Sequence, residues 1–133
     1  MFQDTYPPKV DGVNVSVQLF SDELRRRGHE VIIIGPRFPG HAYGAIPEDT
    51  ILVPAVSAEF LFPQTSLGKF WQTFEHSEIG AVFSRRRPDI IHSHTDFTLG
   101  LWSASYWRTR LGPMGTRRVH TYHTLWTEYL HYL

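Results

Sequence analysis

Histidine is the residue type in this sequence whose spacing most readily suggests chemistry. The segment "IIHSHTD" places His92 and His94 two residues apart, with Asp96 two residues further on. In an extended strand, residues i and i+2 lie on the same face, so the two imidazoles are expected side by side. Together with Asp96 they have the composition of a His-x-His-x-Asp metal site. We favour packing or a ligand contact over a metal, because zinc would need further ligands in convergent positions.

A second pair of histidines occurs in "VHTYHT", where His120 and His123 are three residues apart. On a strand this spacing puts them on opposite faces, so they cannot hold one ion together. His123 lies nearer the carboxyl end of the strand, which is where open α/β sheets bind ligands. A neutral imidazole there could hydrogen-bond a hydroxyl group or act as acid or base near neutral pH. A purely structural histidine at a strand end is an equal alternative.

The segment "DTYPPKVDGVNVS" has the character of a loop that leads from a strand into a helix. Gly12 would let the backbone approach a ligand closely, and the amides of the following helix N-terminus favour a phosphate. An ordinary strand-to-helix turn explains the same residues. The segment contains neither G-x-G-x-x-G nor a P-loop, so no known nucleotide fingerprint supports the ligand hypothesis.

The elements that must position these residues alternate between strand and helix. The apolar runs "EVIIIGP", "TILVP", "DIIHSH" and "TRRVHTYH" predict four strands. Helical periodicity predicts a helix from the N-cap Asn14 to Gly28, one through Leu67, Phe70, Trp71 and Phe74 to Arg86, one over residues 96–112, and one beginning at Thr124. Such alternation predicts a doubly wound, Rossmann-like parallel sheet. Only Met1 to Gln3 precede the first loop, so the first strand of such a sheet is expected to be almost wholly missing.

Composition sets further bounds on the class of protein. The 133 residues are 41% hydrophobic and 20% charged, with a net charge of zero, which indicates one globular domain and no nucleic-acid partner bound by bulk electrostatics. Cysteine is absent, which excludes disulfides and thiolate metal ligands. No segment approaches the roughly 20 apolar residues of a membrane span, and the start is not a signal peptide, so we expect a cytoplasmic protein. The aromatic-dense residues 59–74 fit core packing or an interfacial membrane element.

Four motifs occur in order along nearly the whole chain: D-x-Y-x-P-x-x-x-G-V, L-x-x-x-G-H-E-V, P-D-I-I-H-x-H and T-Y-H-T. In this combination the sequence resembles the N-terminal domain of family 4 glycosyltransferases, which have the two-domain GT-B architecture. The run from Thr121 through Tyr129, His131 and Tyr132 is most similar to the branch that makes glucosyl-diacylglycerols in bacterial membranes.

The resemblance implies transfer of a hexose, with retention of configuration, from a nucleotide sugar such as UDP-glucose to a diacylglycerol-type lipid or a sugar. It implies no divalent metal and no cofactor besides the donor. His123 would lie beside the transferred sugar or the acceptor hydroxyl as the catalytic residue. Five further residues would bind donor or acceptor in the interdomain cleft: Tyr6, Gly12, Val13, His94 and Asp96.

The sequence also departs from the family pattern, because the second domain with its E-x7-E motif is not within residues 1–133. We therefore expect the acceptor-side domain of a larger enzyme, truncated at both ends and inactive alone, with possible peripheral contact to the inner face of the membrane. The main alternative is a non-catalytic flavodoxin- or Rossmann-like binding module, which explains the alternation of elements but not the ordered motifs. A histidine-based metal hydrolase is a third alternative.

Overall fold

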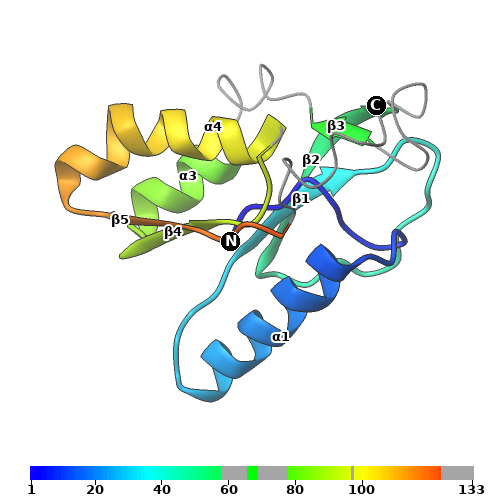
Figure 1. Cartoon of the computed structure of the whole chain (residues 1–133), viewed down its shortest axis with the longest axis horizontal. Helices are drawn as coiled ribbons and strands as arrows, with labels where there is room; N and C mark the ends of the chain where they lie inside the picture. The colour runs from blue at the N-terminus through cyan, green and yellow to red at the C-terminus, as the bar shows by residue number, and fades with distance from the viewer. Residues whose placement is uncertain (58–65, 69–77, 97, 124–133) are drawn as a thin grey trace.

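The computed structural model describes residues 1–57, 66–68, 78–96 and 98–123. Its helices and strands, shown in Figure 1, are α1 (Gly12–Arg26), β1 (Ile33–Arg37), β2 (Thr50–Ser57), β3 (Ser66–Gly68), α3 (Glu78–Arg85), β4 (Ile90–Ser93), α4 (Thr98–Tyr106) and β5 (Arg117–His120). Helix α4 continues as a π-helical stretch, η1 (Trp107–Leu111), and a 3-10 turn, η2 (Gly112–Met114). No described helix is both long and apolar enough to cross a membrane.

The strands form two parallel pairs that meet at the N-terminal residues. β1 pairs with β2, and β4 pairs with β5, both in parallel. Phe2 forms parallel bridges to both Ile34 and Ser93. Its amide donates to the carbonyl of His92 over 2.8 Å, and its carbonyl accepts from the amide of His94 over 2.9 Å. Residues 1–3 therefore take the place expected for the first strand, between β1 and β4.

The helices lie on both sides of these strands, with α1 on one side and α3 and α4 on the other (Figure 1). This arrangement confirms a mixed α/β fold with parallel strands. The doubly wound sheet as a whole stays a prediction, and the second partner of β2 runs antiparallel to it. β3 pairs with β2 in antiparallel register, with Val56 opposite Leu67.

The strand β3 shows that one predicted helix is wrong at its start. Leu67 was expected on a helical face, but it lies in the strand that pairs with β2. A short apolar run fits either periodicity, and here the backbone hydrogen bonds offered by β2 decide the outcome. The described helix α3 spans Glu78–Arg85, and its end is close to the predicted Arg86. Phe70, Trp71 and Phe74 lie outside the described residues, as does the helix expected from Thr124.

The N-cap of helix α1 lies three residues earlier than predicted. Asp11, not Asn14, is its N-cap: the Asp11 carboxylate accepts a 2.9 Å hydrogen bond from the Asn14 amide. Both residue types are good caps, and the carboxylate also carries the charge that a helix N-terminus favours. The predicted end is confirmed, because Gly28 follows the helix with a φ of 85°, a left-handed conformation that suits glycine.

The apolar core lies between the strands and the helices α3 and α4. Phe2, Ile34 and Ile91 contribute from the strand side, while Phe83 and Trp102 contribute from the helices. The Phe2 ring centroid lies 6.2 Å from that of Phe83 and 5.6 Å from that of Trp102. Each such buried side chain contributes about 1.5–3 kcal/mol of transfer free energy. The helix on the opposite side, α1, buries little: only Val17 and Ser21 are buried among its residues.

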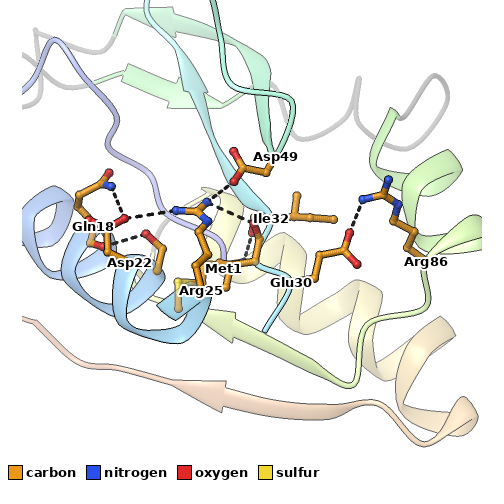
Figure 2. Close-up of polar contacts among 10 residues, drawn as sticks. Met1, Gln18, Asp22, Arg25, Glu30, Ile32, Asp49 and Arg86 are labelled. Carbon is orange, nitrogen blue, oxygen red and sulfur yellow. Dashed lines mark hydrogen bonds and ion pairs between the residues drawn. The ribbon is translucent and has the colours of Figure 1, made fainter. Parts of the chain in front are cut away.

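Because α1 buries so little, polar contacts at its C-terminal end help to hold it. The Arg25 guanidinium forms a 2.6 Å ion pair with Asp49, just before β2, and donates to the carbonyl of Val31 over 3.3 Å (Figure 2). Nearby, the Met1 amine donates to the carbonyl of Ile32 over 2.6 Å. Burial, and then the charge of Arg25, lowers the pKa of this amine to about 5.

Candidate functional site

Three of the predicted site residues, His94, Asp96 and His123, lie where β4 and β5 end. Parallel strands present their carboxyl ends at one edge of a sheet, so the residues that follow them become neighbours. Here the segment from His94 to Asp96 follows β4, and the segment from Thr121 to His123 follows β5. Thr121 still donates its amide to the carbonyl of Ser93 over 2.9 Å, which keeps the two segments in register. The strand itself ends at His120, three residues before the predicted end.

His92 and His94 lie side by side, as their spacing predicted. Their ring centroids are 3.9 Å apart, with an angle of 34° between the planes. The ring of Phe20, from α1, lies 6.0 Å from His92 and 5.8 Å from His94. The Nε2 atom of His92 is 2.7 Å from the hydroxyl of Thr121. The prediction that both imidazoles share one face of the strand is confirmed.

His123 joins this group through a direct contact with His94. The Nδ1 atom of His94 is 3.1 Å from the Nε2 atom of His123, and the rings are stacked at 5.3 Å and 27°. His94 is only 1% exposed, whereas His123 is partly exposed. Of the two, His123 is therefore the residue placed to meet a ligand, and His94 lies behind it.

The environment keeps the inner histidines uncharged. Burial, reinforced by His92, His123 and other nearby positive groups, lowers the pKa of His94 to about 3. Burial, together with the N-terminal amine and neighbouring histidines, lowers the pKa of His92 to about 4. Both imidazoles are neutral at pH 7, so each carries one N–H donor and one acceptor nitrogen.

His120 lies on the other face of β4 and β5. Its Nδ1 atom is 2.8 Å from the hydroxyl of Ser93, and its Nε2 atom is 2.8 Å from a carboxylate oxygen of Asp96. Because Ser93 lies between His92 and His94 in the extended chain, its side chain points the other way. The prediction that His120 and His123 lie on opposite faces is confirmed. Within the described part of the chain, no three histidine or acidic side chains converge as a metal site would require.

Asp4 is a residue of this edge that the sequence reasoning left without a role. Its carboxylate is buried, with 6% of the residue exposed, and it accepts hydrogen bonds at the start of α4. The donors are the Leu99 amide at 2.7 Å, the Thr98 hydroxyl at 2.6 Å, the Thr95 hydroxyl at 2.5 Å and the Gly100 amide at 3.4 Å. The only sequence signal was its place as the first letter of the motif D-x-Y-x-P.

Tyr6, Gly12 and Val13 lie on the segment that leads from the sheet into α1. Tyr6 packs against Gly35, where an added Cβ would come within 3.2 Å of the tyrosine side chain. Gly12 is the first residue of α1 and is exposed, with open space where a Cβ would be. Val13 follows it in the first helical turn and is partly buried.

Among the predicted site residues, His94 and His123 are in direct contact. Asp96 contacts His120, on the other face of the strands.

The fold is an α/β domain whose polar residues lie at the carboxyl ends of parallel strands, the edge at which open α/β sheets generally bind ligands. Its family follows from comparison: the description Glycosyltransferase Family 4 matches residues 10–133, so the chain belongs to that family. This confirms the resemblance seen in the motifs.

Two characterised relatives are alpha-monoglucosyldiacylglycerol synthases. The one from Streptococcus pneumoniae (strain ATCC BAA-255 / R6) is 31% identical over 134 residues, and the one from Acholeplasma laidlawii is 26% identical over 133 residues. Both alignments cover 100% of this chain but only 28% and 31% of the respective relatives. The chain thus spans less than a third of their length. No solved structure matches it.

Proposed function

We propose that this chain is the acceptor-side part of a retaining glycosyltransferase that transfers a hexose from a nucleotide sugar to a diacylglycerol-type lipid. The observation that carries the proposal is the family match over residues 10–133, together with two relatives that are named as glucosyldiacylglycerol synthases. UDP-glucose is the donor we propose, and we propose a cytoplasmic enzyme in peripheral contact with the inner face of the membrane, where a lipid acceptor would lie.

In this proposal His123 contacts the transferred sugar or the acceptor hydroxyl. Its partly exposed ring at the carboxyl edge of β5 supports that role. Gly12 and Val13 would lie close to the donor diphosphate, since the first helical turn presents free backbone amides that favour negative charge. Asp11 already accepts the Asn14 amide, so the remaining amides of that turn are the ones available to a phosphate.

The leaving diphosphate carries the charge that the enzyme must stabilise. Positive groups and helix N-termini suited to this task would come mainly from a second domain that grips the nucleotide. We therefore propose that residues 1–133 alone have negligible transferase activity. Tyr6 and Asp96 would complete the wall of the cleft on this side. No cofactor or divalent metal enters the proposed reaction.

The test is an assay of glucose transfer from labelled UDP-glucose by the protein that contains this chain. One assay uses vesicles that contain diacylglycerol as the acceptor, and a parallel assay uses a soluble sugar acceptor. We expect transfer to the lipid, and a decrease in turnover of about 100-fold or more in His123→Ala with unchanged circular dichroism. Unchanged turnover in His123→Ala would reject its catalytic role, and binding of the nucleotide sugar without transfer would favour the binding module.

A further inference from the structure

The contact between His94 and His123 restricts where their protons can lie. The His94 Nδ1 and His123 Nε2 atoms are 3.1 Å apart, so one of them carries the hydrogen and the other accepts it. Two arrangements satisfy this contact. Either His94 donates from Nδ1, or His123 donates from Nε2.

The second nitrogen of His94 distinguishes the two arrangements. Its Nε2 atom is buried and has no hydrogen-bond partner among the residues that the structure describes. If His123 were the donor, neutral His94 would carry its own hydrogen on Nε2, leaving an N–H group buried without an acceptor. If His94 is the donor, Nε2 is left only with an unused lone pair. Orphaned buried N–H groups are rarer in proteins than under-used acceptors, so donation from His94 is favoured.

The neighbours of His94 hold it in this orientation. The ring of His92 lies against it at 3.9 Å, and His92 is itself fixed by the Thr121 hydroxyl at 2.7 Å. The ring of Phe20 covers the pair from α1. Packing from both sides gives the His94 ring little freedom to turn, and its 1% exposure excludes water from replacing His123 as a partner.

We propose that His94 is a positioning residue: its Nδ1–H donates to Nε2 of His123 and thereby fixes His123 as the tautomer that carries its hydrogen on Nδ1. His123 then offers a ligand an N–H donor and not a basic lone pair. This inference rests on the proposed glycosyl transfer. In that reaction the tautomer makes His123 a hydrogen-bond donor to an oxygen of the sugar or acceptor, and not a base that removes a proton from that oxygen.

Nitrogen NMR tests the tautomer directly and does not depend on activity. In the 15N-histidine-labelled protein that contains this chain, assigned with a His123→Gln variant, Nε2 of His123 should give an unprotonated signal and Nδ1 a protonated one at pH 7.5. In His94→Leu the two tautomers of His123 should interconvert. In His94→Asn, whose side-chain amide can replace the Nδ1–H donor, the wild-type pattern should return. The exposed His29 provides a matched control, His29→Asn, which should change nothing.

Activity provides the second measurement. Loss of one positioning hydrogen bond in His94→Leu should lower kcat/KM for transfer about tenfold, with most of the rate restored in His94→Asn. A protonated Nε2 on His123 in the wild-type protein would overturn the inference, whatever the activity. Absence of transferase activity together with the expected tautomer would reject the proposed function and support the His94–His123 arrangement.

Discussion

The carboxylate of Asp4 accepts a 2.7 Å hydrogen bond from the backbone amide of Leu99, 95 residues later in the chain. The Thr98 hydroxyl shares the same oxygen, and the Thr95 hydroxyl donates to the other. One buried side chain therefore caps α4 and joins the N-terminal loop to the loop that carries Asp96. These loops form the edge at which we place the ligand.

Replacing Asp4 with alanine should destabilise the fold by about 2–4 kcal/mol. The change removes the acceptor that caps α4 and thereby leaves several buried donors without a partner. Urea unfolding followed by circular dichroism measures the loss. Glu48→Ala is the control, because Glu48 is exposed and should shift the free energy of unfolding by less than about 0.5 kcal/mol. Equal stability of the two variants would contradict the capping role of Asp4.

The two neighbouring arginines Arg25 and Arg26 should differ in their importance for stability. Arg25 joins α1 to Asp49 and to the carbonyl of Val31, so Arg25→Ala should cost about 1–2 kcal/mol. Arg26 is 70% exposed along its side chain and, among the residues that the structure describes, pairs with Glu23, three residues before it. Its replacement by alanine should cause no measurable change. Thermal unfolding of both variants compares them, and a larger loss for Arg26→Ala would contradict this account.

The contribution of His92 and His94 to stability should fall as the pH decreases from about 6.5 towards 4. The unfolded chain binds a proton at each histidine near pH 6.5, whereas the folded chain resists protonation of His92 and His94 until about pH 4 and 3. The stabilisation is thus fully present above pH 6.5 and is lost at up to about 1.4 kcal/mol per pH unit for each histidine. Urea unfolding at successive pH values should show a shallower loss in His94→Asn. An identical pH profile would contradict the burial of a neutral His94.

Gly12 offers a way to separate ligand approach from folding. A Cβ at this position meets no atom within 4 Å, and the backbone is helical, so Gly12→Ala should keep or slightly raise stability, by up to about 1 kcal/mol. If the donor diphosphate approaches this backbone, the added methyl group should lower glucose transfer about tenfold or more. Gly44→Ala, equally free of neighbours, should leave transfer unchanged. Full activity of Gly12→Ala would remove this glycine from the site.

Features with a local signal could be predicted from the sequence. The left-handed Gly28 after a helix, and the shared face of His92 and His94, follow from rules that involve only a few neighbouring residues. The prediction of Asn14 as N-cap was wrong, because Asp11 is an equally good cap by residue type and a local rule does not choose between them. The prediction of Leu67 on a helix was wrong because Leu67 belongs to a strand that forms by pairing with β2.

In the candidate site, too, features with a local signal could be predicted from the sequence, whereas features that depend on distant residues could not. His123 could be selected from its place near a strand end, since the fold class says which end binds ligands. The contact with His94 required the register between β4 and β5, in which His92 lies opposite Val119. Asp4 could not be assigned a role because all its side-chain hydrogen-bond donors come from residues 95–100. Its function depends on where two distant loops meet.

The position of Phe2 has a consequence for the order of folding. Phe2 bridges Ile34 in β1 and Ser93 in β4, which are far apart in the sequence. Its contacts therefore carry a high entropic cost of loop closure. Each parallel pair can form before residues 1–3 insert between them. In pulse-labelled hydrogen exchange, the amide of His94, which donates to the carbonyl of Phe2, should therefore become protected after the amides within the β1–β2 pair. Residues 1–3 would therefore be among the last parts of the described fold to find their native neighbours.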